Sequence, residues 1–204
     1  MHASAMLPSG AVTAHCLRLQ PGDELMPSLR QAASTILGRL PREQFGSVFV
    51  ITAVGSLQDV TLRLANASRM DGDQNYGNDI KRYENIRFEI VSLTGTFSRD
   101  DGCHVHISLA DAEGKTVGGH LVDGVIFTTC ELVLGTAEGV EFVRKMDYET
   151  GYNELEVHQL CSRSVDSTRF SSARAPEAGT PFWVHAMYAM AFFWYNVMIW
   201  KIFM

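Results

Sequence analysis

Alternating apolar and polar positions recur along the first two thirds of the chain and predict β-strands. Such alternation, or a continuous β-branched run, occupies residues 13–20, 47–55, 60–65, 86–93, 103–109, 116–122 and 125–134. Successive side chains of a strand point to opposite faces, so one face of each segment can pack on a core. Turns that contain glycine separate the segments. The pattern predicts seven or eight strands in a mainly antiparallel sheet.

One segment has helical periodicity instead. Between the first two predicted strands, apolar residues recur at spacings of three and four and form one stripe, which consists of Leu25, Leu29, Ala32, Ala33, Ile36 and Leu37. Asp23 is suited to the N-cap and Pro27 to the first helical turn, so two starting points remain open. One helix packed on an antiparallel sheet makes an α+β fold.

Composition divides the chain into four parts. Residues 1–12 lack the basic start and long apolar run of a secretory signal and are predicted to be a flexible leader. Residues 13–150 form the folded body, in which the polar stretch 66–83 is predicted to be a long loop. Residues 151–181, rich in Ser, Arg, Ala, Thr and Pro, are predicted to be a polar linker. A hydrophobic tail, 182–204, follows.

The hydrophobic tail contains no charged residue from Phe182 to Trp200. As a helix, these residues would extend roughly 30 Å, which is close to the thickness of a hydrocarbon core. Trp183 and Trp200 lie near the two ends, where aromatic side chains favour the membrane interface. Three interpretations stay open: a membrane anchor, a segment packed on a partner or on the body, and an alternative C-terminus without a selected role.

Charge and cysteine spacing narrow the function classes. The net charge of −6 arises in residues 13–150, which hold 13 basic and 19 acidic residues without a basic cluster. A broad nucleic-acid-binding face is therefore not expected. The four cysteines lie far apart and form no CxxC pair, which argues against a zinc finger or a dense disulfide framework. This spacing suits a reducing compartment, so we expect an intracellular protein on the cytoplasmic side.

Three histidines form the strongest chemical pattern. His104 and His106, in CHVHISL, share one face of a predicted strand. If residues 112–114 make a hairpin turn, His120 lies on the neighbouring strand and completes a three-nitrogen cluster. Three imidazoles suit Zn²⁺ and leave a fourth position open for water or a ligand. Plain surface histidines remain the alternative. Binding needs neutral imidazoles, so it should weaken below a pH of about 6.5.

A carboxylate near such a cluster could accept a proton or orient a metal ligand. Glu89 lies in the middle of a predicted strand and is the candidate catalytic residue. It is suited to be a general base, a hydrogen-bond partner of a metal ligand, or a solvated edge residue, and Glu131 has the same ambiguity. The sequence contains no GxSxG, GxxxxGK[ST] or GxGxxG motif. A nucleophilic or nucleotide-binding enzyme is therefore not indicated.

The order of several motifs resembles a known family. PGDEL, TAVGSLQDVTLRLA, FEIVSLTGTF, CHVHISLADAEGKTVGGHL and TTCELVLG follow one another within residues 13–148. This series resembles the PPC domain, named for plants and prokaryotes. The leader, the linker and the hydrophobic tail have no counterpart in that domain.

The resemblance implies a seven- or eight-stranded antiparallel sheet with one helix, assembled as a homotrimer. It implies that His104, His106 and His120 are metal ligands, with zinc as the expected ion, and it makes Glu89 a stronger candidate. Plant members bind DNA through an Arg-Gly-Arg-Pro element that this chain lacks, so no direct DNA binding is expected. The expected function is a homotrimeric metal-binding module with a binding or regulatory role. A metal-dependent enzyme is the alternative.

Overall fold

The structure is a computed structural model that describes residues 7–65 and 80–160. The hydrophobic tail 182–204, with its predicted role as an anchor, lies outside the described residues, as do half of the predicted leader and most of the predicted linker. Within the described part, no helix is long and apolar enough to cross a membrane.

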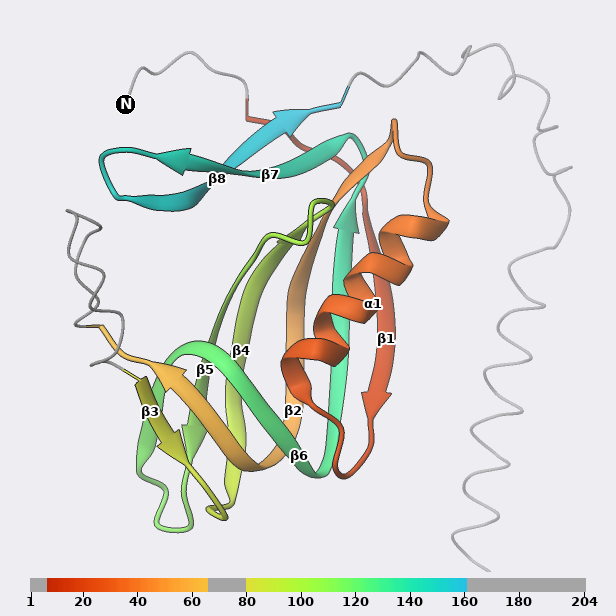
Figure 1. The fold of residues 1–204 in the computed structure, drawn as a ribbon. Coiled ribbons are helices and arrows are strands. Elements are labelled where there is room, and N and C mark those ends of the chain that lie inside the picture. The colour runs from red at the N-terminus through yellow and green to blue at the C-terminus, as the bar shows by residue number, and fades with distance from the viewer. Residues whose placement is uncertain (1–6, 66–79, 161–204) are drawn as a thin grey trace, which may run out of the picture. The chain divides into compact units, whose positions relative to one another are not determined.

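Strands dominate the described chain and one helix accompanies them, which confirms the predicted α+β class (Figure 1). The elements in chain order are β1 (Val12–Leu19), α1 (Leu25–Arg39), β2 (Phe45–Arg63), β3 (Ile80–Tyr83), β4 (Phe88–Ser98), β5 (Cys103–Ala110), β6 (Thr116–Ala137), β7 (Val140–Asp147) and β8 (Tyr152–Gln159).

The strands form one eight-stranded sheet with the order β1-β6-β5-β4-β2-β7-β8, and β3 pairs with β2. All pairs are antiparallel except the short contact between β2 and β7. The long strand β6 pairs with β5 near its start and with β2 along most of its length, so β2, β4, β5 and β6 close into a ring. Residues of β2, β5 and β6 consequently become neighbours where the ring closes.

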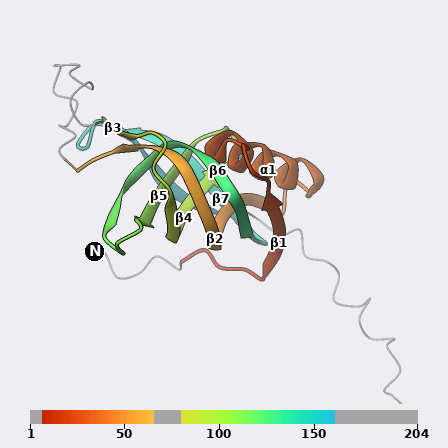
Figure 2. The same cartoon turned by 90° about the horizontal axis from the view of Figure 1, so that it is seen from below.

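The helix covers one side of this curled sheet (Figure 2). Its buried residues are Leu25, Met26, Leu29, Ala33 and Leu37, and Ala32 and Ile36 pack beside them, which confirms the predicted stripe. Complete burial of a leucine contributes about 2 kcal/mol to folding, so this stripe fixes the helix on the sheet. The N-cap is Glu24 and Pro27 lies in the first turn. The Asp23 carboxylate accepts a hydrogen bond from the Gln20 backbone N–H instead.

Two pairs of predicted strands are continuous. The segments predicted at 47–55 and 60–65 both belong to β2, and those at 116–122 and 125–134 both belong to β6. The polar and glycine residues that suggested turns lie at irregularities of the ladder instead. The register of β2 against β6 shifts on both sides of Leu57, next to Gly55 with its φ of 152°. Bulges of this kind bend a strand without ending it.

Two strands lie where a loop and a linker were expected. β3 occupies the end of the predicted loop and pairs with β2. β8 pairs along its whole length with β7, so the predicted linker began too early at residue 151. Gly151, with a φ of 76°, closes this hairpin and donates its N–H to the Asp147 carbonyl at 2.8 Å. These strands are short and largely polar, so their composition resembles that of a linker.

Candidate metal centre

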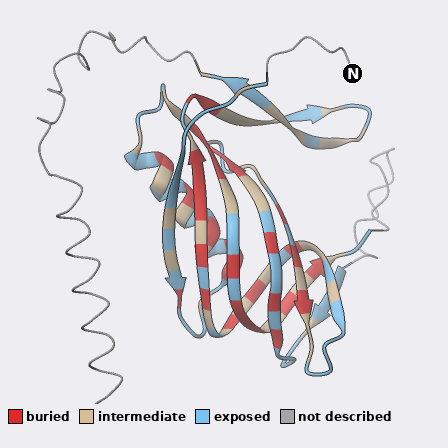
Figure 3. Ribbon diagram, turned by 180° about the vertical axis from the view of Figure 1, so that it is seen from behind, coloured by how far each residue is buried: buried red, intermediate tan, exposed pale blue. Residues whose placement is uncertain are grey.

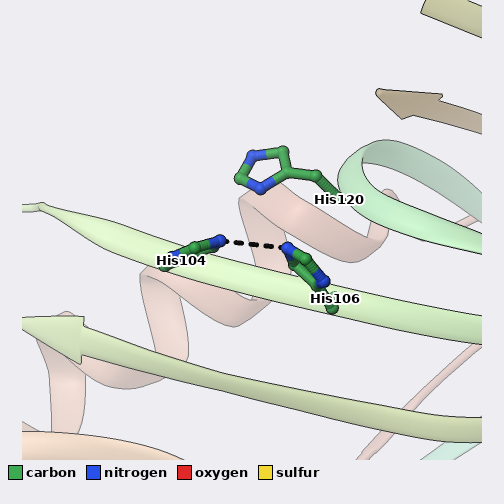
Figure 4. Close-up of side chains that lie close together, drawn as sticks. All are labelled: His104, His106 and His120. Atoms are coloured by element: carbon green, nitrogen blue, oxygen red, sulfur yellow. Dashed lines mark hydrogen bonds between the residues drawn. The ribbon is translucent and has the colours of Figure 1, made fainter. Parts of the chain in front are cut away.

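The three predicted ligand histidines lie on β5 and β6, at the end of the stretch where these strands pair. His104 and His106 are exposed, whereas Val105 and Ile107 of the same strand are buried, as the predicted alternation requires. Figure 3 shows this alternation of buried and exposed residues along the strands. His106 lies directly opposite His120 in the antiparallel register. The predicted hairpin is confirmed, and the three imidazoles gather in one place (Figure 4).

The imidazole rings are close enough to share one ion. The Nε2 atoms of His104 and His106 are 3.0 Å apart, and the ring centroids of the three pairs are separated by 4.8, 5.1 and 5.5 Å. One ring nitrogen of each histidine lies within 4.8 Å of the others. Nitrogens around a tetrahedral zinc ion lie roughly 3.3 Å apart, a spacing that small side-chain rotations would reach. Metal binding itself stays a prediction.

One ring nitrogen of the cluster lacks a partner. Nδ1 of His120 is buried and has no hydrogen-bond partner among the described residues. A buried polar nitrogen without a partner costs free energy. An ion or ligand held by the cluster would reduce this cost, whether directly or by reorienting the ring. The donor set, three imidazoles on two paired strands, therefore fits a nitrogen-preferring ion such as zinc.

The surroundings favour neutral imidazoles. Burial lowers the pKa of His120 to about 4, and the positive charges of Arg63, His104 and His106 act in the same direction. Burial also lowers the pKa of His104, assisted by His106, Arg144 and Arg63 and opposed by Glu154. Neutral imidazole is the form that binds a metal ion. The imidazoles of His104 and His120 are thus in the form that a metal ion would need at neutral pH.

A cavity of 670 Å³ lies beside the histidines. The sheet contributes His104, His106, His120 and Arg63 to its wall, and the β7–β8 hairpin contributes Arg144, Tyr152 and Glu154. Its size is in the range of sites for small molecules. An ion on the histidines would therefore have an open side facing this space.

The two glycines before His120 allow the neighbouring strands to approach β6 closely. A Cβ atom at Gly118 would lie 2.7 Å from the Ile107 carbonyl oxygen, and one at Gly119 would lie 2.7 Å from the Arg63 carbonyl oxygen. Side chains are excluded there because the neighbouring backbones of β5 and β2 approach too closely. The glycines thus allow β6 to pair on both sides, which brings His120 to the cluster.

The candidate carboxylate Glu89 is not brought to the histidines. It is exposed on β4 and lies opposite Ala110, four residues along β5 from His106. Four residues of strand extend roughly 13 Å. Glu131 lies opposite Val54 and Arg18 on a distant part of β6. Neither residue lines the cavity.

Glu154 is the carboxylate that the structure places beside the histidines, and the sequence analysis missed it. Residue 154 fell within the predicted linker, so it was not considered. Alternation of apolar and polar residues before and after the DYETG turn was the available signal for a hairpin. The same hairpin supplies Arg144, which lies in the predicted body but beyond residue 134, where no further strand was predicted.

Comparisons with known proteins agree with the fold. The chain is 36% identical to the bifunctional protein GlmU of Synechococcus sp. (strain JA-3-3Ab) over 79% of its own length, but it spans only 23% of that protein. It is 30% identical to AT-hook motif nuclear-localized protein 13 of Arabidopsis thaliana, covering 68% of this chain and 29% of that one. A solved structure of a hypothetical protein from Salmonella enterica matches with a TM-score of 0.61 and 28% identity, covering 75% of this chain and 98% of that one.

A family model also matches the chain from just before β1 to the end of β6. The model described as the Plants and Prokaryotes Conserved domain matches residues 6–138, which include α1 and all three histidines. The β7–β8 hairpin lies beyond this match. The resemblance noted in the sequence is therefore confirmed, and the chain belongs to the Plants and Prokaryotes Conserved (PCC or PPC) domain family.

Proposed function

We propose that this chain is a homotrimeric zinc-binding module with a binding or regulatory role. The observation that carries the proposal is the cluster of His104, His106 and His120, whose ligand nitrogens lie within 4.8 Å of one another. Three neutral imidazoles leave a tetrahedral ion one open position, which is typical of sites that bind an exchangeable ligand. The trimer is proposed from membership of the family alone.

Metal content and native mass of the full-length chain test this proposal together. We expect about one zinc ion per chain and three per assembled particle, measured by inductively coupled plasma and native mass spectrometry. Zinc bound at this ratio to a monomer would overturn the trimer and leave the metal site. A trimer that neither contains nor takes up zinc, cobalt or nickel would overturn the metal site.

A metal-dependent enzyme is the second candidate, and Glu154 is the observation that favours it. Its carboxylate lines the same cavity as the histidines, which is where a general base would have to lie. A bound zinc ion would supply a water of lowered pKa. Glu154→Gln keeps the shape of the side chain and removes the base. If it abolishes a hydrolytic activity of the zinc-loaded chain without loss of zinc, the enzyme is favoured over the binding module.

DNA and membrane contacts are separate questions. The chain lacks an Arg-Gly-Arg-Pro element, so we propose no direct DNA contact of the AT-hook kind. Fluorescence anisotropy with an AT-rich duplex tests this, and saturable binding at physiological salt would overturn it. We also retain an intracellular location, on the cytoplasmic side, with the hydrophobic tail 182–204 as a candidate anchor. Membrane fractionation of the full chain and of a chain ending at residue 181 tests that role.

A further inference from the structure

We propose that the cavity beside the three histidines binds a small anionic molecule through the guanidinium groups of Arg63 and Arg144. The ligand class is a carboxylate or a phosphate, both of which present oxygen atoms to a guanidinium and to a metal ion. This inference deepens the proposed function and rests on it, since one ligand oxygen would take the open position of the ion.

Arg63 is positioned by two elements. It lies directly opposite His120 in the register of β2 and β6, so its backbone is adjacent to a proposed ligand. Its guanidinium carbon lies 5.7 Å from the centroid of the Tyr152 ring, which comes from β8. Stacking of this kind orients a guanidinium while leaving its N–H groups available at the edge. The side chain lines the cavity.

Arg144 approaches the histidines from the hairpin. Its Nη2 atom donates a hydrogen bond to the Thr96 hydroxyl at 2.6 Å, and Thr96 lies directly opposite His104 in the register of β4 and β5. The guanidinium is therefore held beside a proposed ligand. Its Nε atom is buried and lacks a hydrogen-bond partner among the described residues. This unused donor belongs to a group that lines the cavity.

The charges around the cavity are not balanced. Two guanidinium groups and one carboxylate, Glu154, line it. Among the described residues, no carboxylate oxygen lies within 4.0 Å of either guanidinium, since the ion pairs found there join Glu156 to Lys145 and to His158. A divalent ion would add two further positive charges. Because the chain as a whole carries −6, this positive cavity is a local feature suited to an anion.

The volume of the cavity limits the ligand to a small molecule. At 670 Å³ it exceeds what an isolated ion needs and is within the range of sites for metabolites. An exposed, extended basic surface would be expected for a nucleic acid, and the two arginines do not form one.

The experiment uses the full-length chain loaded with Co²⁺, whose visible spectrum reports on ligands that enter the coordination sphere. Acetate and inorganic phosphate are the anionic probes, and acetamide is the neutral control. Calorimetry gives the affinities. We expect acetate or phosphate to bind and to change the spectrum, and acetamide to do neither. The tighter of the two anions assigns the ligand class.

Variants test the arginines. Arg63→Ala and Arg144→Ala should each weaken anion binding about tenfold or more while cobalt content is unchanged. Arg63→Lys and Arg144→Lys should restore part of the affinity. Arg42→Ala is the matched control, because Arg42 is exposed and does not line the cavity. If Arg144→Ala unfolds the hairpin, Thr96→Val removes the hydroxyl that holds the guanidinium, and it should weaken anion binding without removing the charge.

Two results would overturn the inference. Both are measured with cobalt bound, so they differ from a failure of the metal site. The first is an unchanged anion affinity in both alanine variants with cobalt bound. The second is that acetamide binds as well as acetate. If the wild-type chain takes up no metal, the proposed function fails, and the same titrations are made on the metal-free chain. Arginine-dependent anion binding there supports the inference, and absence of binding overturns it.

Discussion

Arg63 of β2 lies directly opposite His120 of β6 in the antiparallel register. On its other side, β6 pairs with β5, where His106 lies opposite the same His120. His120 is thus paired with Arg63 on one side and with His106 on the other, because the ring of strands closes at this point. The permanent positive charge of Arg63 therefore lies next to the histidine cluster. The histidines and the arginine are combined in one site by strand pairing alone.

Substitution of the histidines should remove the metal and spare the fold. His104→Ala and His120→Ala are each expected to reduce zinc content from about one ion per chain to near zero, because two imidazoles hold zinc much more weakly than three. The number of chains per particle, measured by native mass spectrometry, should not change. His158→Ala is the control, since that exposed imidazole contacts Glu156 on β8 and does not line the cavity. Equal zinc content in wild type and both variants would reject the site.

His120 should titrate at a lower pH than an ordinary histidine, and the stability that depends on it should change over that lower range. In the metal-free chain the folded pKa of His120 is lowered from 6.5 to about 4. Between these values the unfolded chain binds more protons, so stability from this group is present above about 6.5 and is lost as pH falls toward 4. Nuclear magnetic resonance titration should place the His120 midpoint near 4. A midpoint at 6 or above would contradict the burial of this ring.

The same argument applies to the unfolding temperature. His120→Gln removes the titrating group, so the decline in unfolding temperature between pH 6.5 and pH 4 should be smaller in this variant than in wild type. Zinc should shift the wild-type decline to lower pH, because a bound ion also excludes the proton. Identical pH profiles of the metal-free wild type and variant would show that His120 does not contribute.

Arg99 should be important for stability. It donates hydrogen bonds to the Leu37 carbonyl at the end of α1, at 2.9 Å, and to the Phe45 carbonyl at the start of β2. Arg99→Ala leaves both half-buried carbonyls without this donor and should lower the free energy of unfolding by about 2–3 kcal/mol. Urea denaturation measures this. Arg42→Ala, an exposed change of the same charge, should stay within about 0.5 kcal/mol of wild type, and equal losses in both would contradict the argument.

Two glycines should respond in opposite directions to alanine. A Cβ atom at Gly55 would lie 2.1 Å from the Thr129 carbonyl oxygen, at a φ of 152° that favours glycine, so Gly55→Ala should cost more than about 1 kcal/mol. Gly38 lies within α1 and has open space around it, so Gly38→Ala should stabilise the protein by about 0.5–1 kcal/mol. Urea denaturation of both variants measures the difference, and effects of the same sign would contradict it.

Removal of β8 should show whether the three histidines hold zinc without the residues of the hairpin. A chain that ends at residue 150 keeps all three histidines but lacks Glu154 and the strand that pairs with β7. We expect zinc content to be unchanged and the unfolding temperature to fall by roughly 5 °C or more relative to a chain that ends at residue 160. Calorimetry and metal analysis measure the two effects. Loss of zinc from a truncated chain that remains folded would contradict this expectation.

The sequence by itself determined the fold class, the helix and the three histidines. Periodicity decides which side chains of a strand or helix share a face, so HxH on a strand and the stripe from Leu25 to Leu37 could be read from local spacing. A short hairpin turn between 110 and 116 then fixed His120 opposite His106.

Only the tertiary structure decided what surrounds the histidines. Ring closure pairs β2 with β6 and brings Arg63 beside His120, although 57 positions separate them in the chain. The β7–β8 hairpin adds Arg144 and Glu154, whereas Glu89 stays four residues away along the sheet. Local pattern carries no information about which strands will pair, and bulges let a strand continue through residues that normally end it. The histidine cluster was therefore predictable, and the charged residues around it were not.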